Sequence, residues 1–95
     1  MTIAIQNIQR MCAPILRHAG VKRSAIFGSF ARGEAGKKSD VDFLVEFKPG
    51  ASLLNLVALE EALGQALKRD VDVVTYNAIS PSMRDRILKD AVSIL

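Results

Sequence analysis

The chain has 95 residues, enough for one domain, and no second block of apolar periodicity is left to build another. Hydrophobic residues make up 49% and charged residues 24%, a composition that fits a globular protein and excludes a disordered one. No apolar run approaches the roughly 18 to 20 residues that span a bilayer, and the N-terminal segment is too polar for a signal peptide, so we expect a cytoplasmic protein. The net charge of +3 comes from scattered basic residues and does not by itself indicate a nucleic-acid partner.

Residues 3–19 predict an amphipathic helix, because apolar side chains recur at steps of three and four. These side chains are Ile5, Ile8, Cys12, Ile15, Leu16 and Ala19. Pro14 cannot donate a backbone hydrogen bond, so it predicts a kink near residues 10–14, or two short helices, before Gly20 ends the element. A single cysteine, Cys12, excludes an internal disulfide, and its apolar neighbours predict a buried thiol.

Residues 21–27 read as a first strand, since they form a short, largely apolar run bounded by Gly20 and Gly28. Gly28 then turns the chain, and residues 29–32 can form one helical turn directly after it. The free N–H groups at the start of that turn would point towards an anion held above the strand end. A polar loop follows over residues 33–39.

Residues 40–47 alternate strictly between two faces and predict a second strand, packed on one side only. One face carries Val41, Phe43, Val45 and Phe47, and the other carries Asp40, Asp42, Leu44 and Glu46.

The second half of the chain predicts a helix, a strand and a final helix. Ser52 is a suitable N-cap for a helix through Leu67, whose shared face carries Leu53, Leu56, Leu63 and Leu67, with Leu59 and Glu60 at its margin. Residues 71–75 predict a third strand. Ser80 and Pro81 open a helix that the apolar spacing carries to the end of the chain. Apolar residues outside the core stripes, namely Leu54, Val57 and Val92, are candidates for contact with a partner.

Two aspartates on one face of the second strand predict a metal site. Asp40 and Asp42 lie about 6.6 Å apart along the backbone, so their carboxylates can converge on ions roughly 3.5 to 4 Å apart. A divalent cation would relieve their mutual repulsion. Asp72, polar among valines on the third strand, has the matching parity for a third ligand or general base. Asp70 is the competing candidate, although its place at the start of the strand is also typical of an exposed turn residue.

Ordinary structural explanations compete with the metal site. Asp40 could serve turn chemistry where the loop meets the strand, and the whole polar face could be merely solvated. The position of Asp42 speaks against both turn chemistry and a merely solvated face. Aspartate is disfavoured inside a strand, so its presence there indicates a bound partner.

Gly28-Ser29, ten intervening residues and Asp40-x-Asp42 form a pattern that resembles the nucleotidyltransferase superfamily that includes DNA polymerase β. The whole chain resembles the minimal nucleotidyltransferase branch of that superfamily. The resemblance extends over the FGS turn at 27–29, ARG at 31–33, SDVD at 39–42, VDVVT at 71–75 and the SPSMRDRI opening of the last helix.

The resemblance implies an α/β fold of the α+β type: a small mixed sheet of three or slightly more strands backed by helices, with ATP and two Mg²⁺ ions on its open face. Gly28 and Ser29 would hold the β- and γ-phosphates, with Arg32 and Ser39 as further nucleotide contacts. Asp40, Asp42 and Asp72 would be the catalytic and metal-binding residues.

The resemblance also implies a partner, because minimal members are typically encoded beside a HEPN-domain toxin, and some adenylylate a tyrosine on it. The leading hypothesis is therefore an antitoxin enzyme that transfers AMP to that toxin. A second hypothesis is an antitoxin that acts by binding alone, with a weak or vestigial nucleotide site. Direct nucleic-acid binding is a third, although the sequence offers no aromatic platform or basic groove-reading helix for it.

Overall fold

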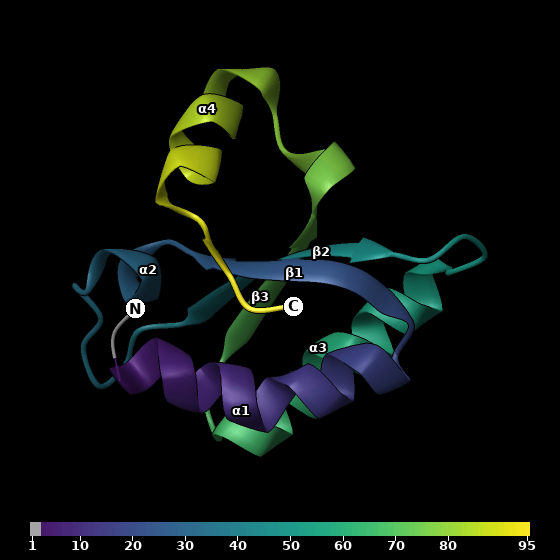
Figure 1. The fold of residues 1–95 in the computed structure, drawn as a ribbon, viewed down its shortest axis with the longest axis horizontal. Helices are drawn as coiled ribbons and strands as arrows, with labels where there is room; N and C mark the ends of the chain where they lie inside the picture. The colour runs from purple at the N-terminus through teal and green to yellow at the C-terminus, as the bar shows by residue number, and fades with distance from the viewer. Residues whose placement is uncertain (1–2) are drawn as a thin grey trace.

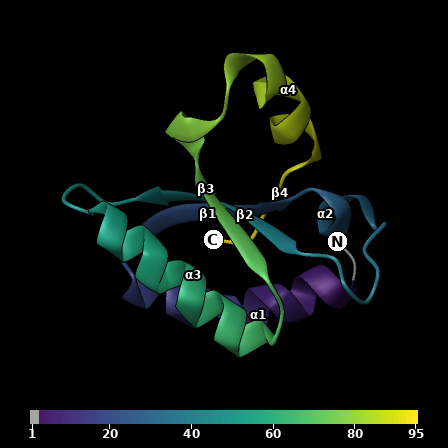
Figure 2. The ribbon, with the colours of Figure 1, turned by 180° about the vertical axis from the view of Figure 1, so that it is seen from behind.

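The computed structural model describes residues 3–95 as a four-stranded mixed sheet with helices on both faces (Figure 1). Its elements, in chain order, are α1 (Ile3–His18), β1 (Val21–Phe27), α2 (Ser29–Arg32), β2 (Val41–Phe47), α3 (Leu53–Leu67), β3 (Val71–Thr75), the 3₁₀ helix η1 (Tyr76–Ala78), α4 (Pro81–Asp90) and β4 (Val92–Ser93). Helices α1 and α3 lie along one face, and η1 and α4 rise over the other (Figures 1 and 2). The expected α/β class with a mixed sheet is confirmed. No helix in this part of the chain is long and apolar enough to cross a membrane.

The strand order is β3-β2-β1-β4, and the direction of each strand brings the motif residues to one edge of the sheet. Strand β1 runs antiparallel to β2, with Phe27 opposite Asp42. Strands β2 and β3 run parallel, joined through α3, with Asp42 beside Asp72. The end of β1 therefore meets the starts of β2 and β3, where the Gly28 turn and the aspartates belong. Strand β2 begins at Val41, one residue later than predicted.

The main core lies between the sheet and the pair α1 and α3. It contains Ile5, Ile8, Cys12 and Leu16 of α1, Val41, Phe43 and Val45 of β2, and Leu59 and Leu63 of α3. Cys12 is buried, as predicted, and burial raises the pKa of its thiol to about 11. Helix α1 is one uninterrupted helix with Pro14 inside it, so the predicted division into two helices is wrong.

Helix α3 packs most of the predicted face against the core, with Leu63 buried and Leu56 and Leu67 partly buried, but it differs from the prediction at two positions. Ser52 caps it as expected, and the Ser52 N–H donates to Asn55 Oδ1 at 2.6 Å. Leu59, placed at the margin from sequence, is 2% exposed, whereas Leu53 is 74% exposed. Leu53 lies in the first turn, beyond the part of α3 that covers β3, so its side chain has no core to enter.

The second face of the sheet is also packed, which corrects the expectation of a strand buried on one side only. Leu44, on the same face as Asp42, is fully buried with Ala25 and Ile79. Ile79 follows η1, in the segment that carries the chain over this face (Figure 1). The aspartate end of this face is left more open, with Asp40 and Asp72 exposed.

The final helix ends at Asp90 rather than at the end of the chain, so its predicted extent is wrong. Strand β4 follows and pairs with β1, with Ala25 opposite Ser93 and Ile26 opposite Val92. This pairing satisfies backbone groups that β1 would otherwise expose as an edge strand. Val92 packs against the main core, so it is not available to a partner, in contrast to Leu54 and Val57.

Candidate active site at the Gly28 turn and the aspartate edge

Gly28 lies directly against the carboxylate of Asp42. Its φ of 75° and ψ of −150° fall in a region that is essentially restricted to glycine. A Cβ at this position would overlap the Asp42 Oδ2 atom and lie 3.2 Å from its Cγ. The glycine therefore gives the turn its conformation and also leaves the space that the carboxylate occupies.

Helix α2 starts immediately after this turn, as predicted, and leaves backbone donors at the site. The Gly28 carbonyl accepts a hydrogen bond from the Arg32 N–H at 3.1 Å, and the Ser29 carbonyl accepts one from Glu34 at 2.9 Å. Gly28 offers no side chain to cap the helix. The first N–H groups of a helix have no acceptor within it, so an anion beside this turn could accept from them.

Three aspartates meet at this edge of the sheet. Asp42 and Asp72 are direct neighbours across the β2–β3 pair, and Asp40 precedes Asp42 by two residues. Burial raises the pKa of the half-buried Asp42, and the negative charges of Asp72 and Asp40 raise it further, while Arg32 lowers it. The negative charge gathered here is what a bound cation would neutralise.

Asp70 has a different environment. Its backbone carbonyl accepts a hydrogen bond from the Val41 N–H at 3.1 Å, and it borders a surface hollow together with Glu61 and Lys68. It is not among the charges that shift the pKa of Asp42. This geometry favours Asp72 over Asp70 as the third carboxylate.

The donor set at this edge fits magnesium bound together with a nucleotide. Among residues 3–95, no three His, Cys, Asp or Glu side chains are arranged to hold a metal ion by themselves. Mg²⁺ usually takes one or two protein carboxylates and completes its octahedral shell with water and substrate phosphate oxygens. Asp42 with its neighbours can supply that number of carboxylates.

The two further nucleotide contacts expected from sequence are engaged with other partners. Arg32 forms ion pairs with Glu34 at 3.0 Å and with Asp90 at 3.6 Å, which link α2 to the end of α4. The Ser39 hydroxyl accepts a hydrogen bond from the Gly36 N–H at 2.8 Å, within the loop before β2. Either side chain would have to exchange a partner to contact a phosphate.

Arg69 is a residue of the site that sequence reasoning missed. Its Nη1 donates to the Ser39 carbonyl at 2.8 Å and to the Gly36 carbonyl at 3.2 Å. Its guanidinium also lies over the Phe30 ring, 5.1 Å from the centroid. In sequence it is a basic residue between a helix and a strand, and only the folded chain brings it to the loop.

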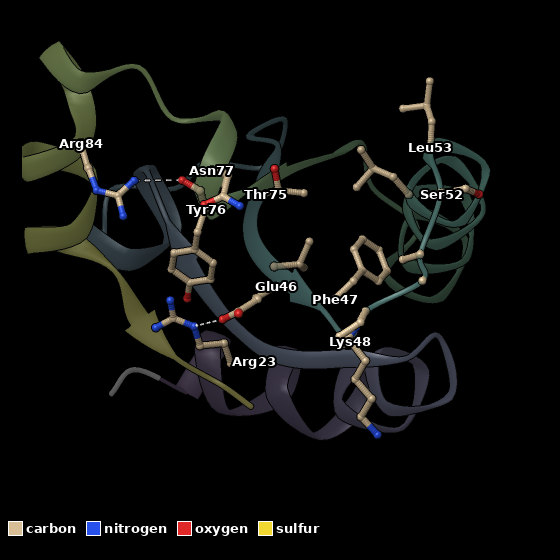
Figure 3. Close-up of a pocket in the computed structure, with 15 residues that line it drawn as sticks. Arg23, Glu46, Phe47, Lys48, Ser52, Leu53, Thr75, Tyr76, Asn77 and Arg84 are labelled. Carbon is tan, nitrogen blue, oxygen red and sulfur yellow. Dashed lines mark hydrogen bonds and ion pairs between the residues drawn. The ribbon is translucent and has the colours of Figure 1, made fainter.

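A cavity of about 610 Å³ lies at the opposite ends of β2 and β3 (Figure 3). Arg23 pairs there with Glu46 at 2.6 Å and stacks over Tyr76 at 4.1 Å, and Arg84 donates to the Tyr76 carbonyl at 3.0 Å. None of the aspartates lines this cavity. This cavity is therefore separate from the Gly28 turn and the aspartates.

Residues 10–94 match the sequence profile described as "Nucleotidyltransferase domain". The chain belongs to the nucleotidyltransferase domain family. The predicted resemblance to minimal nucleotidyltransferases and the prediction of an enzyme are thereby confirmed.

Two relatives of this nucleotidyltransferase carry names that assign them to the protein adenylyltransferases. The Methanocaldococcus jannaschii protein MJ0435 is 53% identical over 91 residues, covering 96% of this chain and 98% of its own. The protein adenylyltransferase MntA of Thermococcus cleftensis is 39% identical over 75 residues, covering 79% of this chain and 76% of its own.

Solved structures share the fold. One described as a minimal nucleotidyltransferase has a TM-score of 0.82 and 34% identity, covering 94% of this chain and 91% of its own. A toxin–antitoxin structure with AMP-PNP matches with a TM-score of 0.80 and 21% identity, covering 92% of this chain and 72% of its own. A complex of a tri-AMPylated Shewanella oneidensis HEPN toxin with MNT antitoxin matches with a TM-score of 0.73 and 20% identity, covering 95% of this chain and 71% of its own. At these last two identities the likeness establishes the fold alone.

Proposed function

We propose that this nucleotidyltransferase transfers AMP from ATP to a hydroxyl group, expected to be a tyrosine, on a partner HEPN-domain toxin, and so acts as its antitoxin. The observation that carries the proposal is the contact between Gly28 and the Asp42 carboxylate, with Asp72 in register beside it. That contact joins a turn with free backbone donors to a group of carboxylates, the two parts that a metal-bound triphosphate requires. The relatives are named protein adenylyltransferases, and this supports a protein as the acceptor of AMP.

Each residue of the proposed site has a role in the transfer. Backbone donors at Gly28 and Ser29 would hold the β- and γ-phosphates, and Asp40, Asp42 and Asp72 would hold two Mg²⁺ ions. When bound, the ions supply charge stabilisation at the entering and leaving oxygens. Arg32 is the candidate for a further phosphate contact, because its guanidinium is already within electrostatic reach of Asp42.

The proposed reaction is an in-line displacement at the α-phosphorus. Asp72 accepts the proton of the attacking hydroxyl while the hydroxyl oxygen forms the new bond to phosphorus. The bond to the bridging oxygen breaks, and pyrophosphate leaves with that electron pair. The acceptor gains AMP through a phosphodiester bond, and no covalent bond to this chain forms.

The exposed apolar residues of α3 support contact with another protein. Leu54 is 79% exposed and Val57 is 48% exposed, next to Leu53 in the first turns of the helix. The predicted partner contact at Leu54 and Val57 is part of this proposal. The partner would bring the acceptor hydroxyl to Asp72.

A transfer assay tests this function. The protein is incubated with α-labelled ATP, Mg²⁺ and a HEPN-domain protein encoded beside it, and label is expected on the HEPN protein. Asp42→Asn should abolish labelling, whereas Asp85→Asn, a matched change on the exposed surface of α4, should not. Absence of label with the unaltered protein would contradict the proposal.

The same pair of proteins separates the enzyme from an antitoxin that acts by binding alone. If Asp42→Asn still neutralises the HEPN protein as fully as the unaltered chain while transferring no AMP, binding is sufficient. Under the proposed function, neutralisation is lost together with the transfer.

A further inference from the structure

Arg69 connects three parts of the site that are separate in sequence. Its guanidinium donates to the carbonyls of Gly36 and Ser39, in the loop between α2 and β2, at 3.2 and 2.8 Å. It also lies 5.1 Å from the ring centroid of Phe30, the buried residue of α2. The residue itself precedes β3, the strand that carries Asp72. One side chain therefore contacts α2 and the loop, from a backbone position just before the third strand.

The end of α3 places Arg69 in this position. Lys68 adopts the left-handed conformation, with φ of 54°, and ends the helix. The Arg69 N–H then donates to the Gly64 carbonyl at 3.3 Å, and the Asp70 carbonyl accepts from Val41 at 3.1 Å. With the backbone held on both sides, the Arg69 side chain extends back over the loop that precedes Asp40.

That loop has few other attachments. Between residues 33 and 40 the described bonds within the loop are Ser39 N–H to the Gly36 carbonyl, 3.2 Å, and Gly36 N–H to the Ser39 hydroxyl, 2.8 Å. Both bonds close the loop on itself, and its other attachments lie at its start, where the Glu34 N–H donates to the Ser29 carbonyl at 2.9 Å and Ala35 packs against the main core. The two bonds from Arg69 are the ones that tie it to the end of α3. The Ser39 carbonyl is the group directly before Asp40, so fixing it fixes the start of the aspartate pair.

We propose that Arg69 is a positioning residue, which holds the loop before β2 so that Asp40 stays beside Asp42 and Asp72 and can share a Mg²⁺–nucleotide complex with them. The inference rests on the proposed function for its consequence, but its mechanical part concerns this chain alone. Arginine suits the role because the two N–H groups of Nη1 donate to both carbonyls while the planar guanidinium lies over an aromatic ring, and the ammonium of lysine has donors but no planar face for that ring.

Amide hydrogen exchange of the full chain tests the mechanical part. In Arg69→Met, the amides of Gly36 and Ser39 should exchange at least about 10-fold faster, while those of β1 and α1 keep their rates. Arg69→Lys should fall between, since an ammonium can still donate to the carbonyls but has no planar guanidinium to lie over Phe30. Arg17→Met, an exposed arginine on α1, is the matched control and should change nothing at the loop. If Arg69→Met does not fold, the exchange rates of the Gly36 and Ser39 amides are compared between Arg69→Lys and the control Arg17→Lys instead. Loop amides that exchange at the unaltered rate would overturn the proposal.

Magnesium dependence of ATP binding tests the consequence. The Mg²⁺ concentration that gives half-maximal binding of a fluorescent ATP analogue should rise at least about five-fold in Arg69→Met and less in Arg69→Lys. A residue needed only for overall stability would lower Tm without moving this value, and that result would overturn the positioning role. Should the unaltered protein bind the analogue but label no acceptor, the proposed function fails while the exchange and magnesium results still decide the role of Arg69.

Discussion

The Asp42 carboxylate occupies the space that a side chain on Gly28 would fill, with Asp42 Cγ only 3.2 Å from the position of a Cβ there. The two residues are 14 positions apart, and the β1–β2 pairing brings them together by setting Phe27 opposite Asp42. The spacing of the glycine-serine turn from the aspartates is thus the length of chain needed to turn through α2, cross the loop and return along β2. This contact explains why the turn and the strand act as one site.

Gly28→Ala should reduce nucleotide transfer by at least about 100-fold, because the new methyl group displaces the Asp42 carboxylate and the backbone conformation is strained as well. Gly20→Ala is the control. Its φ is 82°, but no atom lies within 4 Å of the added Cβ, so it should cost stability of about 1 kcal/mol and leave the rate nearly unchanged. Transfer rates normalised to folded protein, with Tm for each variant, make the comparison. Equal rates for the two variants would show that the contact has no catalytic importance.

Asp72→Asn and Asp70→Asn should separate the two candidates for the third carboxylate. Asp72 is in register with Asp42, so its change to asparagine should lower kcat by about 100-fold or more. Asp70 contacts β2 through its backbone carbonyl, which the substitution preserves, and its variant should retain activity within about two-fold. Steady-state kinetics at saturating Mg²⁺ and ATP measure both. The reverse order of effects would move the site from Asp72 to Asp70.

Much of this architecture follows from local signals in the sequence. The predicted strands at residues 21–27 and 71–75 are confirmed, because the first is a short run bounded by Gly20 and Gly28 and the second is rich in valine. The turn at Gly28 and the N-caps at Ser52 and Ser80 also follow from the sequence, because glycine is typical of such a turn and serine is a preferred N-cap residue. The parity of Asp72 placed it on the correct face before its register with Asp42 was known.

The errors concern contacts between distant segments. Residues 91–95 fit helical spacing, but the backbone of β1 offers them strand pairing, and that tertiary contact outweighs the local pattern. Leu44 read as an isolated apolar residue on a polar face, and its partners Ala25 and Ile79 come from elements whose packing the sequence does not specify. Arg69 was missed for the same reason, because its two acceptors are 30 and 33 residues away.

Asp42→Asn should raise Tm near neutral pH when no Mg²⁺ is present, by an amount that solvent screening keeps small at a half-buried group. Burial and the charges of Asp72 and Asp40 raise the pKa of Asp42 in the folded protein, so its ionised form destabilises the fold. The loss of folding stability caused by ionised Asp42 is fully present above its raised pKa in the folded protein. It disappears as the pH falls through that pKa to below the pKa of the same group in the unfolded chain. The difference in Tm between the variant and the unaltered chain should therefore shrink on acidification.

Thermal unfolding followed by circular dichroism, with and without Mg²⁺, checks this pH dependence. Added Mg²⁺ should raise the Tm of the unaltered chain more than that of Asp42→Asn, since a ligand that binds only the folded state stabilises it. Asp85→Asn, on the exposed surface of α4, is the control and should follow the unaltered chain at every pH. A variant less stable than the unaltered chain near neutral pH would contradict the assigned cause.

Lys68→Gly should stabilise the protein by about 0.5–1 kcal/mol, because Lys68 holds a φ of 54° that side chains with a Cβ rarely adopt. It ends α3 in the left-handed conformation at which glycine is the preferred residue. For a domain of this size the gain corresponds to a rise in Tm of roughly 2–8 °C. Exposed Lys48, in the loop before α3, gives the control variant Lys48→Gly, which loses a positive charge without relieving a left-handed residue. If both variants shift Tm equally, loss of charge rather than backbone strain accounts for the change, whereas a rise confined to Lys68→Gly assigns it to the end of α3.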